Sequence, residues 1–145
     1  MDEFFYEALN QARKSYNEGG IPIGSVLVYE NKIIGKGHNQ RVQKSSAILH
    51  GEMDAIENAG RQPVYVYKNS VLYTTLSPCP MCTGTILLYG IPKVIIGENQ
   101  TFLGSEDLLR QHGVEVVVLN SQECIDLMKK FIEEKPHVWD EDIGV

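Results

Sequence analysis

The chain has few cysteines, no long apolar run and no concentration of basic residues. Three cysteines among 145 residues are too few, and odd in number, for a disulfide framework. No apolar stretch approaches the ~18 residues that a membrane-spanning helix needs. The start of the chain, residues 1–5, is acidic where a signal peptide would be basic. We therefore expect a cytoplasmic protein with no membrane partner.

The charge balance argues against a nucleic-acid partner. The formal net charge is -6 at pH 7, and the densest basic stretch, residues 41–44, holds only two positive charges. Proteins that bind nucleic-acid phosphates usually carry a basic patch, because phosphate contacts dominate their affinity. A small molecule is therefore the expected partner.

Segments of helical and strand periodicity alternate along the chain, with no repeat or linker to divide it. Apolar runs over residues 24–29 and 33–39, joined by a polar turn at residues 30–32, predict an N-terminal hairpin. Further strands are predicted over 70–76, 93–97 and 114–119, and helices over 5–16, 50–59, 80–89, 106–111 and 121–136. Strands separated by crossover helices pair in parallel. The sequence thus predicts one α/β domain over residues 1–145. This domain is a three-layer α/β/α sandwich around a mixed five-stranded sheet, with the later strands parallel.

Two short segments carry residues suited to metal binding. They are His50-Gly51-Glu52 and Pro78-Cys79-Pro80-Met81-Cys82, and each opens a predicted helix. The i, i+3 separation places Cys79 and Cys82 on one helix face, and a helix N-terminus favours the thiolate that binds zinc. His50 completes a His/Cys/Cys set for one Zn²⁺ per chain, which leaves the fourth position to water.

Glu52 lies two residues from a metal ligand and is not itself predicted to bind the metal. Zinc with three protein ligands lowers the pKa of water towards ~7, which supplies hydroxide to attack an amidine-like carbon. Such an attack needs a group that carries a proton to the ring nitrogen and to the departing amine, and Glu52 is the candidate. The combination of H-x-E with P-C-x-x-C is typical of zinc-dependent nucleobase deaminases.

Other interpretations use the same residues. A structural zinc site needs a fourth protein ligand, and Cys124 lies beside the apolar face of the last helix, where a buried, inert thiol is expected. A zinc-stabilised binding module without catalysis has no need of Glu52. A thioredoxin-like redox pair also favours C-x-x-C at a helix start, but it gives no role to His50.

With these residues placed, the chain resembles the cytidine deaminase superfamily, and within it the fungal-type cytosine deaminases that act on the free base. The segments that narrow the resemblance are His50-Gly51-Glu52, Thr75-Leu76-Ser77-Pro78-Cys79, Gly97-Glu98-Asn99 and Asp142-Ile143-Gly144. The resemblance implies hydrolytic deamination of cytosine to uracil and ammonia in pyrimidine salvage, by a zinc-dependent homodimer.

The resemblance also implies how the base is bound. Asn39 would hydrogen-bond the carbonyl edge of the pyrimidine, beside the Gly51 backbone N–H. Asp142 would accept from the ring N1–H, a proton that a nucleoside lacks. Ser77 would also belong to the residues that bind the substrate. By residue type alone, Asn39 could equally be a turn residue and Asp142 part of a solvated acidic tail.

Two aromatic residues would enclose the substrate in members of this family. Phe102 and Trp139 would close over the base, and residues 136–145 would form a C-terminal lid. Without the resemblance, both rings could simply pack a loop or the core. Other substrates within the superfamily stay open, namely guanine, a nucleoside such as cytidine, or adenosine in transfer RNA. The acidic composition disfavours transfer RNA.

Overall fold

The computed structural model describes residues 2–145, and its first two strands form the predicted hairpin. β1 (Gly24–Tyr29) and β2 (Lys32–His38) pair antiparallel. The two residues between them, Glu30 and Asn31, have φ angles of 49° and 65°. Positive φ at both positions is the type I′ geometry, whose twist matches that of the flanking strands. This turn explains why the connection is so short.

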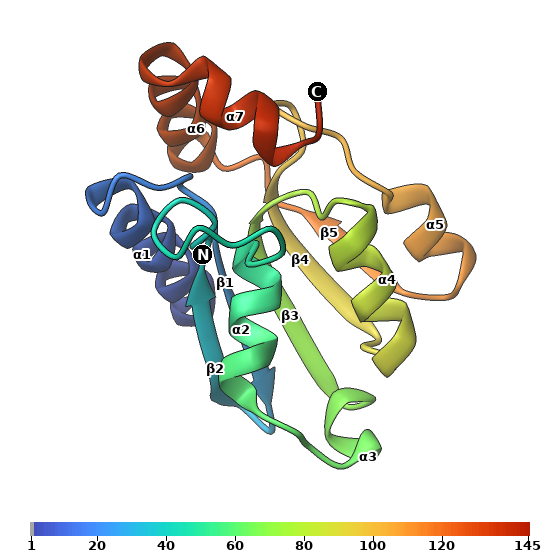
Figure 1. The fold of residues 1–145 in the computed structure, drawn as a ribbon. Helices are drawn as coiled ribbons and strands as arrows, with labels where there is room; N and C mark the ends of the chain where they lie inside the picture. The colour runs from blue at the N-terminus through green and yellow to red at the C-terminus, as the bar shows by residue number, and fades with distance from the viewer. Residues whose placement is uncertain (1) are drawn as a thin grey trace.

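Within residues 2–145 the strands form one five-stranded sheet in the order β2-β1-β3-β4-β5 (Figure 1). β3 (Ser70–Leu76) pairs antiparallel with β1 and parallel with β4 (Lys93–Glu98), which pairs parallel with β5 (Glu115–Val118). The predicted mixed sheet, with a hairpin first and parallel strands later, is confirmed.

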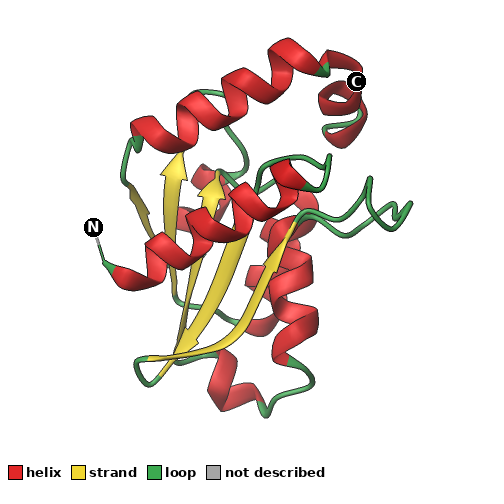
Figure 2. Ribbon diagram, turned by 90° about the vertical axis from the view of Figure 1, so that its left-hand side faces the viewer, coloured by secondary structure: helices red, strands yellow, loops and turns green. Residues whose placement is uncertain are grey.

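Helices cover both faces of this sheet (Figure 2). On one face, α1 (Glu3–Asn17) and α6 (Gln122–Glu134) pack against Val26 and Tyr73. On the other face, α2 (Gly51–Ala59), α4 (Pro80–Tyr89) and α5 (Glu106–Gln111) pack against Leu27 and Leu72. Neighbouring strand residues point to opposite faces, so each strand supplies both cores. The predicted three-layer α/β/α sandwich is confirmed.

The structure contains two short helices that were not predicted, α3 (Val64–Tyr67) and α7 (Pro136–Asp142). Pro136 was expected only to end the last helix, but it also begins α7. Proline lacks the N–H that the first turn of a helix leaves unpaired, so it suits that position. The buried face of α6 is Cys124, Met128 and Phe131, whereas Ile125 and Ile132 flank it and are partly exposed. None of the helices in residues 2–145 has the length and apolar character to cross a membrane.

Close packing of α2 on β2 places the start of α2 at the end of the sheet. A Cβ atom at Gly35 would lie 2.3 Å from the Ala55 carbonyl oxygen, and one at Gly37 would lie 2.4 Å from the Ala55 nitrogen. Both contacts are with backbone atoms, which cannot move aside as a side chain could. Glycine at these positions therefore lets α2 lie flat on the hairpin, with His50 at its N-terminus.

Candidate metal and catalytic site

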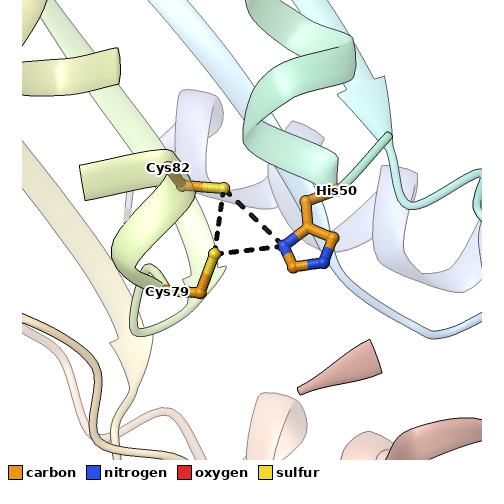
Figure 3. A group of neighbouring side chains, drawn as sticks. All are labelled: His50, Cys79 and Cys82. Atoms are coloured by element: carbon orange, nitrogen blue, oxygen red, sulfur yellow. Dashed lines mark hydrogen bonds between the residues drawn. The ribbon is translucent and has the colours of Figure 1, made fainter. Parts of the chain in front are cut away.

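Two helix N-termini, from α2 and α4, bring the predicted metal ligands together (Figure 3). His50 is the N-cap of α2, Cys79 is the N-cap of α4, and Cys82 lies in the first turn of α4. Figure 3 shows the two thiols and the imidazole pointing towards a common centre. The sequence expectation that each motif opens a helix therefore holds in the structure.

The distances between the three side chains fit a zinc ion. His50 Nδ1 lies 3.3 Å from Cys79 Sγ and 3.7 Å from Cys82 Sγ, and the two sulfur atoms are 3.7 Å apart. Tetrahedral ligands at zinc bond lengths would be about 3.5 Å apart for nitrogen and sulfur and about 3.8 Å for two sulfurs. Within residues 2–145, no other group of three potential ligands lies this close. The cluster is compatible with one zinc per chain.

Hydrogen bonds within the cluster prepare a thiolate for a metal. In the metal-free protein, hydrogen bonds from Cys82 and His50 lower the pKa of Cys79 to about 4. The bond to Cys79, together with burial, raises the pKa of Cys82. Burial alone would lower the pKa of His50, but its bond to Cys79 and the charges of Asp142 and Glu52 raise it to about 9. A thiolate is the form of cysteine that binds metal.

Glu52 lies in the first turn of α2 and lines the same cavity as His50 and Cys79. Its side chain is buried, with 4% of the residue exposed. Burial raises the pKa of this carboxyl to about 7. A carboxyl group that titrates near neutral pH can both accept and donate a proton, as a proton shuttle must.

Residues from the segment after β2, from the start of α2 and from the end of α7 complete the polar wall of the site. Asn39 and Asp142 are buried, and Asn39 Nδ2 donates to Asp142 Oδ1 and Oδ2 at 3.2 and 3.3 Å. His50 Nε2 lies 3.5 Å from Asp142 Oδ1, a contact that orients the imidazole. Gly51 is the first residue of α2, so its N–H has no partner within the helix. The structure therefore brings Asn39, Asp142 and Gly51 to the predicted metal ligands.

Aromatic side chains cover the site. The Phe102 and Trp139 rings meet edge to face, with centroids 6.3 Å apart and planes at 86°. Both rings line the cavity that contains His50 and Glu52, and the volume of that cavity is about 20 Å³. The site is thus enclosed by α7 on one side and by the loop after β4 on the other.

Ser77 also lines this cavity, but its hydroxyl group already has partners. It donates to Glu106 Oε2 at 2.6 Å and accepts from the Gly104 N–H at 2.9 Å. The hydroxyl therefore supports the loop that carries Phe102. Sequence reasoning missed the buried Glu106, because an acidic residue at a helix start is usually explained by the helix dipole alone. It also missed Arg41, although Arg41 stands two residues from Asn39.

Comparisons with known proteins identify the family. The model of the cytidine and deoxycytidylate deaminase zinc-binding region matches residues 1–98. The chain is also 65% identical over 138 residues to the cytosine deaminase of Candida albicans, with 94% of this chain and 92% of that protein covered. The chain belongs to the cytidine and deoxycytidylate deaminase family. The predicted resemblance to fungal cytosine deaminases is confirmed.

Other proteins that match this chain are less similar to it. A tRNA-specific adenosine deaminase of Streptococcus pyogenes is 38% identical over 141 residues, with 90% of this chain and 89% of that protein covered. A solved tRNA deaminase that performs A-to-I editing matches with a TM-score of 0.72 and 24% identity, covering 86% of this chain and 97% of its own. The guanine deaminase of Nitrosomonas europaea matches with a TM-score of 0.69 and 17% identity, covering 88% and 82%. These two structures establish the fold.

Proposed function

We propose that this protein is a cytosine deaminase, which hydrolyses free cytosine to uracil and ammonia with one zinc ion per chain. The observation that carries the proposal is the 65% identity to a cytosine deaminase over 94% of the chain. The metal ligands and Glu52 by themselves specify deamination but not the base. The three cysteines are free, which suits a reducing compartment, and we place the activity in the cytoplasm.

In this mechanism His50, Cys79 and Cys82 hold the metal and Glu52 moves the proton. When bound, zinc supplies a water molecule with a lowered pKa. The Glu52 carboxylate accepts one proton of the water as its oxygen bonds to C4 of cytosine, and passes that proton to the ring nitrogen, where it stays. It then transfers the second proton of the water to the amino group, so that the C4–N bond breaks and ammonia leaves. The pKa of about 7 suits a group that must take and release a proton at neutral pH.

Base recognition is assigned to the polar wall of the cavity. Asp142 accepts from the N1–H of the free base, and Asn39 together with the Gly51 N–H contacts the carbonyl edge. In a nucleoside the sugar replaces the N1 proton, so the Asp142 carboxylate would lose its hydrogen bond and meet the sugar instead. The carboxylate oxygen that faces N1 would then be shielded from water without a donor, which is costly and favours the base over the nucleoside.

We assign residues 136–145 the role of a lid. A volume of about 20 Å³ holds about one water molecule and is too small for a pyrimidine. A wall must therefore move when substrate enters. Trp139, Asp142 and Ile143 form the wall contributed by α7 and the residue after it, at the end of the chain. Displacement of this terminal segment opens the cavity without disturbing the sheet.

An ammonia-release assay with zinc-loaded protein tests the proposed substrate. The panel contains cytosine, cytidine, guanine, adenine and transfer RNA. We expect rapid release from cytosine and little from the others, and loss of that activity in Asp142→Ala. Faster turnover of guanine or of adenosine in transfer RNA would replace cytosine with that substrate. Activity of Asp142→Ala at the wild-type level would remove Asp142 from base recognition.

We also propose that two copies associate through α3 and α4. Leu88 is 74% exposed and Tyr65 62%, and a groove lined by Val64 and Leu88 runs between the two helices. Gly84, one turn before Leu88, has an empty space where its Cβ would be. Glycine inside an exposed helix costs about 1 kcal/mol, and its lack of a side chain suits close approach of a second backbone.

Sedimentation analysis tests this association. The wild type is expected at twice the mass of one chain, and Leu88→Glu at the mass of one chain, because the charge would be buried against the second copy. Tyr6→Glu is the control, since Tyr6 is exposed on α1 at the opposite face of the sheet. A wild-type protein that sediments as a monomer at micromolar concentration contradicts the proposal.

A further inference from the structure

The Arg41 side chain joins the loop before α2 to the C-terminal helix. Its Nη1 donates to Asp142 Oδ1 and to the Glu141 carbonyl oxygen, each at 3.2 Å. Its Nε donates to the Ala47 carbonyl oxygen at 3.1 Å. Ala47 lies on the same loop as Arg41, so this bond fixes the guanidinium in place while Nη1 contacts α7. One side chain thus connects segments about a hundred residues apart in the sequence.

Arg41 also sets which oxygen of Asp142 is available. Oδ1 is close to Arg41 Nη1 and Asn39 Nδ2 at 3.2 Å each, and to His50 Nε2 at 3.5 Å. Among the described residues, the partner of Oδ2 is Asn39 Nδ2 alone, at 3.3 Å. The positive side chain therefore occupies Oδ1 and leaves Oδ2 as the oxygen best able to accept a further hydrogen bond.

The two residues of the Arg41–Asp142 pair line different cavities. Arg41 lines a surface cleft of about 330 Å³, together with Val138 and Glu141. Asp142 lines the enclosed cavity of about 20 Å³ that holds His50 and Glu52. The two side chains contact each other, so the ion pair links a residue of the surface cleft to a residue of the candidate active site.

We propose that Arg41 is a positioning residue, which holds α7 closed and directs Asp142 Oδ2 towards the substrate. This inference rests on the proposed role of Asp142 in recognising the base. The Asp142 side chain is 2% exposed and that of Arg41 23%. Loss of the guanidinium would leave a buried carboxylate without its cationic partner, a state that is strongly unfavourable. The protein would relieve it by moving α7 outwards, where Asp142 meets water.

Trp139 reports the position of α7 directly. It is the single tryptophan of the chain, it lies on α7, and it is 7% exposed. Acrylamide quenching of its fluorescence, in zinc-loaded protein without substrate, measures how often the helix opens. We expect the quenching constant of Arg41→Gln to be about threefold that of the wild type or more, and its KM for cytosine to rise about tenfold or more. A change in kcat without a change in KM would contradict the positioning role.

Two further variants make the experiment specific. Arg13→Gln removes an exposed arginine that pairs with Glu123 at 2.7 Å, far from α7, and should leave quenching and KM unchanged. Arg41→Lys keeps the charge but loses the planar fork that reaches two carbonyls and a carboxylate, so intermediate values are expected. Each variant is first checked for thermal melting and zinc content.

Several results would overturn the inference. One is quenching of Arg41→Gln at the wild-type level, and another is an equal rise in Arg13→Gln. Wild-type behaviour of Arg41→Lys in both measurements would show that charge alone suffices, against the proposed contacts. Quenching needs no substrate, so this result is independent of whether cytosine is the base.

Discussion

At the scale of single residues, the pKa of Glu52 is shifted by a different cause from the pKa values of Cys79 and Cys82. Burial raises the pKa of Glu52 to about 7, against the opposing effect of His50. The metal-binding cysteines, by contrast, are governed mainly by hydrogen bonds to each other. A substitution at Glu52 should therefore disturb the metal site less than a substitution at His50, Cys79 or Cys82.

Glu52→Gln should retain about one zinc per chain and lose activity by about a thousandfold, since general acid–base catalysis contributes about 10²–10⁴. Zinc content is measured by elemental analysis and turnover by the absorbance change of cytosine. Glu57→Gln, an exposed position on the same helix, is the control and should match the wild type. Substantial deamination by Glu52→Gln would remove Glu52 from the mechanism.

Cys124 should be chemically inert in the folded protein. It is buried, and burial raises the pKa of its thiol to about 11. At pH 8 the thiol is protonated, and the thiolate is the reactive form. Peptide mass spectrometry after iodoacetamide treatment should find Cys124 modified in urea but not in native zinc-loaded protein. Rapid native alkylation of Cys124 at pH 8 would contradict this environment.

At the scale of elements, the site depends on how closely α2 packs on the hairpin. His50 and Glu52 both come from the start of α2, and β2 contacts that helix through glycine. Periodicity in the sequence predicted both elements but not their separation. The helix lies close to β2 because Gly35 and Gly37 have no side chains. A pattern of apolar residues does not predict this close approach.

Gly37→Ala should therefore reduce both stability and zinc affinity. A Cβ 2.4 Å from the Ala55 nitrogen must push α2 away, and overpacking of this kind costs about 1–3 kcal/mol. Urea unfolding and zinc competition with a chelator measure the two effects. Lys36→Ala, which loses only an exposed pair with Glu7, should cost at most about 1 kcal/mol. A Gly37→Ala protein as stable as the wild type would show that α2 can move without penalty.

At the scale of the whole molecule, a zinc ion held by His50, Cys79 and Cys82 would join two crossover helices, α2 and α4. These candidate ligands come from N-termini that are separated in the chain by β3. A ligand that binds only the folded state stabilises it by about 4 kcal/mol at a thousand times its Kd. For a chain of this size, that free energy corresponds to a shift of about 10 °C in melting temperature.

Removal of zinc with a chelator should therefore lower the melting temperature by about 10 °C. Scanning fluorimetry measures the shift, and added zinc should reverse it whereas magnesium should not. The same melting temperature before and after complete removal of the metal would show that the two helix N-termini are held by packing alone.

Much of the fold and the metal site could be predicted because the signals are local. The H-x-E and C-x-x-C spacings place ligands within one helical turn, and turn residues 30–31 mark the hairpin. The α3 and α7 helices escaped prediction because four and seven residues carry too little periodicity to recognise. Pro136 made α7 harder to predict, since a proline is compatible with both the end of one helix and the start of the next.

The sequence by itself determined the α/β fold and which residues are the candidate metal ligands and proton carrier, since each follows from residue types at short spacing. Only the tertiary structure decided how the site is closed. Arg41 meets Asp142 across 101 residues, and Ser77 meets Glu106 across 29. Such pairs arise when the sheet and its helices bring distant segments together. Which residues form such a pair depends on their distance in the folded chain, and no local sequence pattern predicts that distance.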